Sequence, residues 1–255
     1  MLILLKINFF IKYVILLVLL SIYSALAEEQ TITFDDGSTY IGNIVNGEMD
    51  GKGLFKSAKD KFNKQLIYSG FFKEGKFSGE GRLAFYNGDI YIGSFKDGLM
   101  HGSGVLKYKN ESEYNGIFKK GNKEGKGKLI YSDGVVYEGD FKNDKIEGVG
   151  KIIYEPGNEY QGEFLNNFMH GKGNIIFKDG SSYKGDFVKG QYSGLGIFIF
   201  SDGTLYKGEF KNGYRDGPGE LIYIDQTKQS GNFKNGDFIG EITITFPDGT
   251  IQKRE

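Results

Sequence analysis

Beyond residue 30, apolar and polar side chains alternate in short runs, and Gly, Asn and Asp interrupt these runs at regular intervals. Alternation with a period of two puts every second side chain on the same face of a β-strand. The interruptions include Asp133-Gly134 and Asp179-Gly180, which are typical of tight turns between antiparallel strands. The pattern therefore predicts many short strands joined by turns.

A string of 23 residues recurs along the chain and sets the spacing of these strands. In most units, Gly at position 3 and Phe at position 5 share one strand, and a turn follows near position 8. Gly at positions 12 and 14, a large apolar residue at 16 and an aromatic residue at 18 then form a second strand, so each unit predicts a β-hairpin. The units start at Tyr40, Tyr68, Tyr91, Tyr114, Tyr137, Tyr160, Tyr183, Tyr206 and Gln229.

The units predict an all-β chain in which hairpins follow one another as an elongated, single-layer antiparallel meander. Within a hairpin, we expect the starting Tyr to face position 16 and the Phe at position 5 to face the Gly at position 12, so that rings cover bare main chain. Neighbouring hairpins must stabilise one another, because a single layer has no separate core. The predicted domains are a cap half-repeat over 28–39 and nine repeats over 40–67 (with an insertion of five residues), 68–90, 91–113, 114–136, 137–159, 160–182, 183–205, 206–228 and 229–251, followed by a short tail to residue 255.

The string YKGEFKNGYRDGPG, from Tyr206 to Gly219, resembles the MORN (membrane occupation and recognition nexus) repeat. The resemblance covers about nine-tenths of the chain, and it is specific because eight consecutive units keep one register. Departures lie mostly at the ends, where Ile44 replaces Phe, Gln229 replaces Tyr and Ile242 replaces Gly; atypical terminal units are expected of a solenoid. The resemblance implies a MORN repeat solenoid with a scaffold or interaction role, and it does not name a partner.

Residues 1–27 are typical of an export signal. Lys6 and Lys12 precede an apolar run that ends in small residues, which predicts a short hydrophobic signal helix that is cleaved after Ala27. The alternative is an uncleaved membrane anchor over residues 2–26, with both lysines extended toward the interface. Either form exports the rest of the chain, so we expect a periplasmic or secreted protein, or one anchored in the membrane.

Composition and charge narrow the function. The formal net charge is −1, and without Lys6 and Lys12 of the leader it is −1 − 2 = −3, so no nucleic-acid partner is predicted. The absence of Cys excludes disulfides, thiol nucleophiles and thiolate metal sites. The two histidines, His101 and His170, hold the same position three repeats apart, about 30 Å, which is too far to share a metal or an active site. The sequence therefore predicts no catalytic residue, no cofactor, no metal and no enzyme.

The aromatic ladder, formed by Tyr at position 1 and Phe at position 5, is the first candidate surface. Its expected role is packing over the glycines. If the sheet curls, the ladder would also line a long groove for an extended peptide, a lipid chain or a sugar polymer. The candidate groove residues are Tyr91, Phe95, Tyr114, Phe118, Tyr137, Phe141, Tyr160, Phe164, Tyr183, Phe187, Tyr206 and Phe210.

The isoleucine stripe, at position 17 of five successive units, is the second candidate surface and lies on the opposite face. One interpretation is a row of good strand formers shielded by Lys and Glu stems. The other is an exposed apolar surface for dimerisation or partner docking. The stripe consists of Ile130, Ile153, Ile176, Ile199 and Ile222.

These features favour an exported, non-catalytic scaffold that binds unidentified protein partners or self-associates as a homodimer at the cell envelope. The alternative is binding to membrane lipid, because MORN repeats are often associated with membranes and acidic lipids. Against it, the exported part is acidic and has no cluster of about four to eight Lys or Arg. A third hypothesis is an accessory role in a lipid kinase or another enzyme, by analogy with MORN arrays attached to such domains, but nothing beyond the array carries that chemistry.

Overall fold

The computed structural model describes residues 30–155 and 157–255. The predicted signal segment 1–27, with its cleavage site after Ala27, lies outside the described residues. Within the described part, the regular structure is all β-strand, and no helix there could cross a membrane. The chain divides into two compact units between Leu99 and Met100, after the first residue of the seventh strand. Each unit is an antiparallel meander of hairpins, as the sequence predicts.

The first unit contains strands that each pair with their neighbour in the chain. The insertion of the first repeat lies in the connection between the third and fourth strands. There the Asp60 carboxylate accepts hydrogen bonds from the amides of Phe62 and Lys64, both at 2.8 Å, so this loop is held by its own side chain. The strands are β1 (Gln30–Thr33), β2 (Thr39–Val45), β3 (Glu48–Lys56), β4 (Ile67–Lys73), β5 (Lys76–Ala84) and β6 (Ile90–Lys96).

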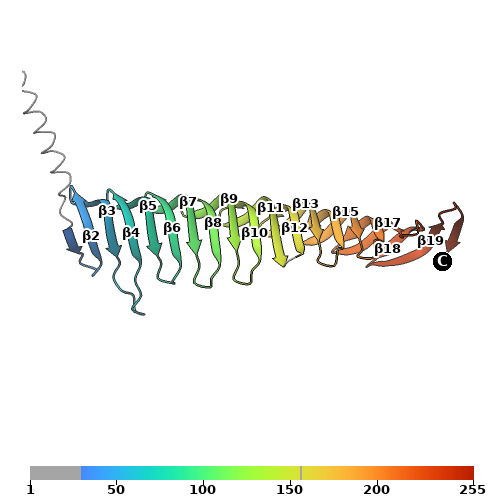
Figure 1. Cartoon of the computed structure of the whole chain (residues 1–255), viewed down its shortest axis with the longest axis horizontal. Coiled ribbons are helices and arrows are strands. Elements are labelled where there is room, and N and C mark those ends of the chain that lie inside the picture. Colours follow the sequence, from blue (N-terminus) through green and yellow to red (C-terminus); the bar gives the residue numbers. More distant parts are fainter. Residues whose placement is uncertain (1–29, 156) are drawn as a thin grey trace, which may run out of the picture. The chain divides into compact units, whose positions relative to one another are not determined.

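The second unit continues the same pattern, and each of its strands again pairs with its chain neighbour. Figure 1 shows β10 to β13 side by side in chain order. The strands are β7 (Leu99–Lys107), β8 (Glu113–Lys119), β9 (Asn122–Ile130), β10 (Val136–Lys142), β11 (Lys145–Glu155), β12 (Asn158–Leu165), β13 (Phe168–Ile176), β14 (Ser182–Val188), β15 (Gln191–Ile199), β16 (Leu205–Lys211), β17 (Tyr214–Ile222), β18 (Lys228–Lys234), β19 (Asp237–Thr245) and β20 (Ile251–Arg254).

The register within a hairpin is the same from repeat to repeat. In β10 and β11, Tyr137 faces Ile152, and Gly139 faces Gly150. The expected pairing of positions 1 and 16 is therefore confirmed. The glycines of positions 3 and 14 lie directly opposite one another, so the middle of the hairpin has no side chain on the face that carries Tyr137 except the tyrosine ring itself.

The Phe at position 5 pairs differently from our expectation. Phe141 faces Ile146 in its own hairpin, whereas Phe164 of the next repeat faces Gly148. The expectation that position 5 faces the Gly at position 12 of its own hairpin is wrong. The turn has only two residues, which brings position 5 opposite position 10 and leaves the extra residues in a bulge. Gly148 lies in this bulge with a φ of 81°, which glycine adopts without steric cost.

In the core, aromatic rings of successive repeats pack against one another. Tyr137 and Tyr160 are 0% exposed. The Tyr137 ring packs edge-to-face against Phe141 of its own repeat and Phe164 of the next, each with a centroid distance of 5.2 Å. Such pairs contribute about 0.5–1.5 kcal/mol beyond their area burial. Because one ring contacts two repeats, this packing holds each hairpin to its neighbour.

Candidate functional site

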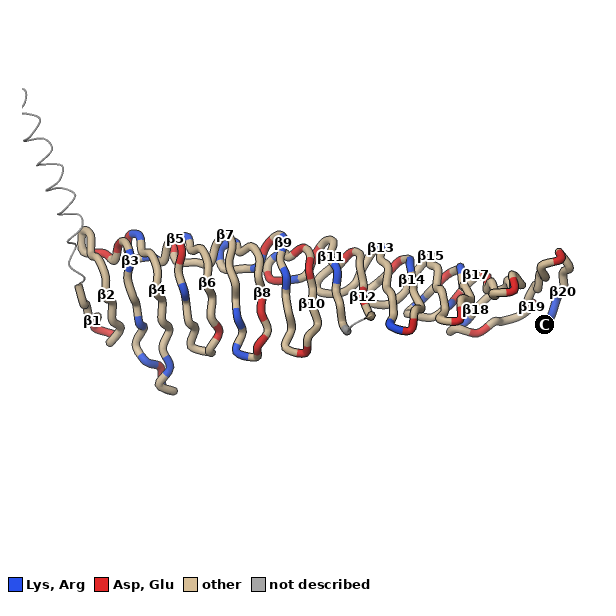
Figure 2. The backbone as a smooth tube through the Cα atoms, viewed as in Figure 1, with Lys and Arg blue, Asp and Glu red and all other residues tan. Residues whose placement is uncertain are grey.

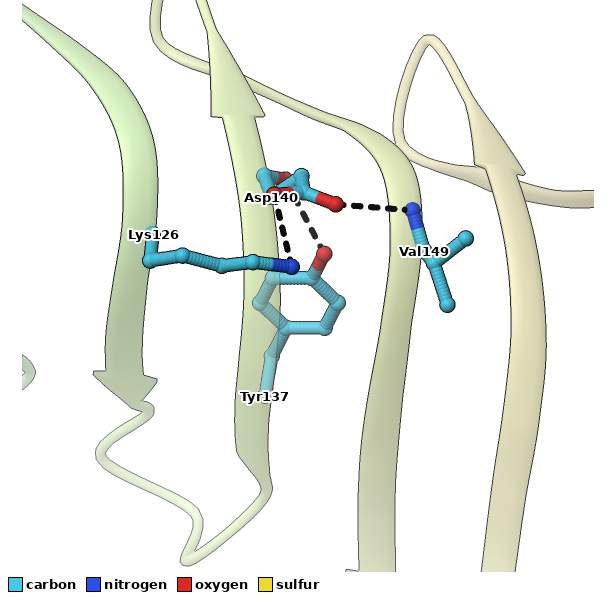
Figure 3. A network of polar contacts seen from close by, with 4 residues as sticks. All are labelled: Lys126, Tyr137, Asp140 and Val149. Atoms are coloured by element: carbon cyan, nitrogen blue, oxygen red, sulfur yellow. Dashed lines mark hydrogen bonds and ion pairs between the residues drawn. The ribbon is translucent and has the colours of Figure 1, made fainter.

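Each starting Tyr lies over the glycines of its own hairpin. A Cβ on Gly150 would lie 2.6 Å from Cε2 of Tyr137, so only glycine fits beneath the ring. The Tyr137 hydroxyl donates a hydrogen bond to the carbonyl of Asp140 at 3.0 Å (Figure 3), where the register shift leaves Asp140 without a partner in β11. The same bond to the carbonyl three residues on is made by Tyr40, Tyr68, Tyr91, Tyr114, Tyr160, Tyr183 and Tyr206.

Burial keeps these hydroxyls protonated. Desolvation raises the pKa of Tyr114 to about 12. Desolvation also raises the pKa of Tyr137, with a further contribution from the charge of Asp140. At neutral pH these side chains are therefore neutral donors, and their contacts explain them as packing and hydrogen-bonding groups.

The carboxylate at position 4 caps the bulge. Asp140 accepts a hydrogen bond from the amide of Val149 at 3.1 Å and pairs with Nζ of Lys126, on β9, at 2.8 Å (Figure 3). Partial burial raises the pKa of this carboxyl, but the hydrogen bonds from Lys126 and Val149 and the charge of Lys126 outweigh it, so the pKa is lowered. An exposed ion pair of this kind contributes about 0–1 kcal/mol. The contacts of Asp140 thus indicate a structural role.

The aromatic ladder does not line an open groove. Its tyrosines are 0% exposed and its phenylalanines 1–6%. The rings are packed against glycine main chain and against rings of the adjacent repeat. The cavity that Phe210 lines with Tyr192 and Phe198 measures only about 190 Å³, below the usual size of a ligand site, about 300–1,000 Å³. Packing over glycine, the other expected role, is what the structure shows. This correction applies to Tyr91, Phe95, Tyr114, Phe118, Tyr137, Phe141, Tyr160, Phe164, Tyr183, Phe187, Tyr206 and Phe210.

The two histidines are not brought together. His101 lies on β7 and His170 on β13, with β8 to β12 between them in the chain. Across residues 30–155 and 157–255, no group of three or more His, Asp and Glu is arranged to hold a metal ion. Neither histidine therefore belongs to a metal-binding cluster of described residues.

The isoleucine stripe lies on the face away from the tyrosine rings. We call this the open face; it carries positions 2, 4, 13, 15 and 17 of each repeat. The stripe is interrupted on the intervening strands, since Ile153 faces the apolar Val136 on one side and the charged Glu159 on the other. Ile222 is half-buried. The other four residues are 37–40% exposed, namely Ile130, Ile153, Ile176 and Ile199.

The largest apolar exposure among these outward positions is on β15. Its residues at positions 13, 15 and 17 are all aliphatic, and we call Leu195, Ile197 and Ile199 the β15 patch. Leu195 is 67% exposed. A groove of about 1060 Å³ crosses the open face here, from Val149 on β11 to Pro218 on β17, and Leu195 and Ile197 lie in its lining. We call this hollow the open-face groove; its size is at the upper end of ligand sites, about 300–1,000 Å³.

Comparison with known families shows what kind of repeat this is. The family model described as "MORN repeat" matches residues 40–60, 68–90, 91–113, 114–136, 137–159, 160–182, 183–205 and 206–228. The chain belongs to the MORN repeat family. The matched segments do not include residues 229–251, although β18 and β19 pair there as a hairpin.

Similar proteins share either a short segment or a distant likeness with this MORN chain. Alsin of Rattus norvegicus is 34% identical over 59 residues, which are 23% of this chain and only 4% of alsin. The TCP10 domain of Danio rerio CPAP is 10% identical, with 89% of this chain and 94% of that domain covered and a TM-score of 0.43. The TCP domain of Drosophila melanogaster SAS-4 is 13% identical over 91% and 92% of the two chains, with a TM-score of 0.19. At such TM-scores neither structure informs the function of this MORN protein.

Leu195 and Ile197 are not among the sequence-predicted sites of this MORN array. The isoleucine stripe is found by looking for a residue that recurs at one position, and such a search overlooks a repeat that departs from its neighbours. The signal is nevertheless present, because only the repeat 183–205 has aliphatic residues at both positions 13 and 15; most other repeats have Lys, Arg, Glu, Ser, Thr or Asn at one or both. Comparing the outward positions repeat by repeat would have found the β15 patch.

Basic side chains flank the β15 patch. Figure 2 shows residues of both charge signs distributed along the strands. At the patch itself the arrangement is local, because Lys184 on β14 and Lys207 on β16 face Ile197 from either side. Both lysines line the open-face groove. An aliphatic centre between two cations is therefore the main chemical feature of this MORN surface.

Proposed function

We propose that this MORN protein is an exported, non-catalytic scaffold that binds protein partners through its open face. The observation that carries the proposal is the exposure of aliphatic side chains there, 37–40% for four residues of the isoleucine stripe and 67% for Leu195. The aliphatic side chains of the β15 patch lie together on one strand, and exposed apolar patches of this kind are typical of interaction surfaces. Export rests on the leader sequence 1–27, and N-terminal sequencing of the protein from its native host should find a chain that begins at Glu28.

Photo-crosslinking in the native cell tests partner binding. A photoreactive residue in place of Ile176, on the open face, should give a discrete crosslinked product that mass spectrometry identifies as a protein. The control position is Phe62, which lies in the loop between β3 and β4 and not on the open face, and is 69% exposed. Equal crosslinking at both positions, or none at Ile153, Ile176 and Ile199, would contradict the proposal.

Self-association is one form of this function, because two open faces can bury their isoleucine stripes against each other. Sedimentation velocity of the purified protein separates the two forms. A dimer that dissociates when Ile153 and Ile176 are replaced by Ser supports self-association through the stripe. A monomer at all accessible concentrations assigns the surface to a different protein.

A further inference from the structure

We infer that the open-face groove binds an extended segment of a partner protein in which an aliphatic residue stands between two acidic residues. This inference rests on the proposed function and deepens it, since it names the chemistry of the partner. It depends on three features of the described residues, namely the exposed aliphatic centre, the two lysines beside it, and the spacing between those lysines.

The aliphatic centre is the part of the groove that water solvates worst. Leu195 and Ile197 are 67% and 36% exposed, and both point to the open face of β15. Covering an aliphatic side chain removes apolar area from water, at about 25 cal/mol per Å². An aliphatic side chain of a partner that packs on these two residues would therefore bind here with the most favourable free energy.

The shape of the groove suits an extended chain. The lining runs from Val149 on β11 to Pro218 on β17, which spans six strand spacings, or about 29 Å. An extended peptide advances about 3.3 Å per residue, so roughly nine residues fill this length. A peptide segment of this length would follow the groove from end to end.

The charges in the groove favour an acidic partner. Its lining contains Lys172, Lys184 and Lys207 but a single carboxylate, Glu220, although the chain without its leader is acidic overall. Lys172 already pairs with Asp186 at 2.6 Å. The remaining lining residues are neutral, so the free charge of the groove is positive and complementary to an acidic partner.

Neither Lys184 nor Lys207 forms an ion pair within the described residues. The ion pairs formed by residues 30–155 and 157–255 include neither of them. Glu220 on β17 directly faces Lys207, but its carboxylate accepts a hydrogen bond from Oγ of Ser230 at 3.2 Å and forms no ion pair with Lys207. Two unpaired ammonium groups therefore stand on either side of Ile197.

The spacing of these lysines sets the order of residues in the partner. Lys184 and Lys207 lie on the strands either side of β15, so their Cα atoms are about 10 Å apart. In an extended peptide, residues i, i+2 and i+4 point to one side, and the outer two are about 13 Å apart. Long lysine side chains bridge this difference, so the segment that fits is acid, any residue, aliphatic, any residue, acid.

Fluorescence anisotropy with a labelled peptide tests the inference. The probe is the nine-residue peptide Ser-Ser-Asp-Ser-Leu-Ser-Glu-Ser-Ser, and its control carries Asn and Gln in place of Asp and Glu. The purified protein should bind the acidic peptide and bind the neutral peptide about fivefold more weakly, because two exposed ion pairs are lost. Binding of the acidic peptide should also weaken as ionic strength rises.

Matched variants locate the binding. The double variant Lys184→Gln and Lys207→Gln should lose about fivefold in affinity for the acidic peptide, and Leu195→Ser should lose about tenfold. The controls are Lys119→Gln with Lys142→Gln, and Val188→Ser, which change exposed residues at hairpin ends and should leave binding unchanged. Circular dichroism of each variant shows whether the sheet is intact.

Four outcomes would overturn the inference. Equal binding of the acidic and neutral peptides, or no binding of either, would exclude an acidic segment as the occupant of the groove. The crosslinks from Ile176 test the proposed function independently of this result. Binding to vesicles of phosphatidylserine and phosphatidylcholine that needs Lys184 and Lys207, without peptide binding, assigns the groove to a membrane surface. A dimer that dissociates on Leu195→Ser assigns the groove to a second copy of the chain.

Discussion

Replacement of Gly219 by Ala should destabilise the protein strongly, and the loss should largely disappear when Tyr206 is replaced by Gln. A Cβ on Gly219 would collide with the Tyr206 hydroxyl and lie 2.6 Å from the ring atoms Cε2 and Cζ. The last repeat already combines these two changes, since it starts with Gln229 and carries Ile242 at position 14, whereas the eight repeats that start with Tyr all have Gly there. A side chain at position 14 is therefore tolerated where the ring is absent.

The magnitude follows from two contributions. Forcing the Tyr206 ring away from a new methyl group costs about 1–3 kcal/mol, as in other overpacked cores. The displaced hydroxyl also loses its hydrogen bond to the carbonyl of Glu209, which is 3.0 Å long and contributes about 1 kcal/mol. Gly219→Ala should thus lower the free energy of unfolding by about 2–4 kcal/mol. In the Tyr206→Gln background there is no ring for the new methyl group to displace. The same change should then be close to neutral, since the higher strand propensity of Ala, about 0.5–1 kcal/mol relative to Gly, offsets any remaining crowding.

Urea unfolding followed by far-ultraviolet circular dichroism, carried out on the wild type, both single variants and the double variant, measures this coupling. We expect a coupling free energy of about 2 kcal/mol or more between Gly219 and Tyr206. If Gly219→Ala costs the same in both backgrounds, the tyrosine ring is not what requires glycine at position 14, and the reasoning is refuted.

Three further predictions concern the tyrosines and the array. Tyr160→Phe should lower the free energy of unfolding by about 1–2 kcal/mol, because the carbonyl of Glu163 loses its donor while the ring stays; an unchanged urea midpoint would exclude this contribution. Unfolded tyrosine has a pKa near 10, and burial raises the pKa of Tyr114 and Tyr206 to about 12. The stability that these tyrosines contribute is therefore complete below pH 10 and is lost as pH rises toward 12. Tyrosinate absorbance should rise together with the loss of β-sheet signal, and ionisation of the tyrosines at a pH well below that of unfolding would contradict this expectation. Deletion of 206–255 should lower the melting temperature but leave the remaining hairpins folded, because stability accumulates between neighbours; complete unfolding by circular dichroism would show that the array is a single cooperative body.

Much of the fold could be predicted from periodicity alone. The pairing of Tyr137 with Ile152 follows from alternation and from the positions of the turns. The pairing of Phe164 with Gly148 could not be predicted in the same way, because it depends on a turn of two residues and a bulge that absorbs the rest. Sequence alternation is insensitive to such a shift, since a slip of two residues leaves every side chain on its face.

The candidate surfaces were predicted less well, for a physical reason. Whether a row of rings is a groove or a core depends on what covers it, and part of the cover for Tyr137 comes from Phe164 of the next repeat, in addition to Phe141 of its own. Exposure on the open face likewise depends on the cross-strand neighbours of each residue. Leu195 and Ile197 are exceptional only in comparison with the same positions of other repeats, so a search for recurring residues does not find them.

The packing of each starting Tyr over glycine main chain decides which face of the sheet is closed and which is open, and the proton chemical shifts of the buried glycines measure it directly. In the protein in solution, one Hα of Gly150 and one of Gly173 should be shifted far upfield by the overlying rings of Tyr137 and Tyr160, so that the two Hα shifts of each glycine differ widely. Gly180, in a turn with nothing within 4 Å of its Cβ direction, should show two similar shifts. Similar Hα shifts at Gly150 and Gly173 as well would contradict the account.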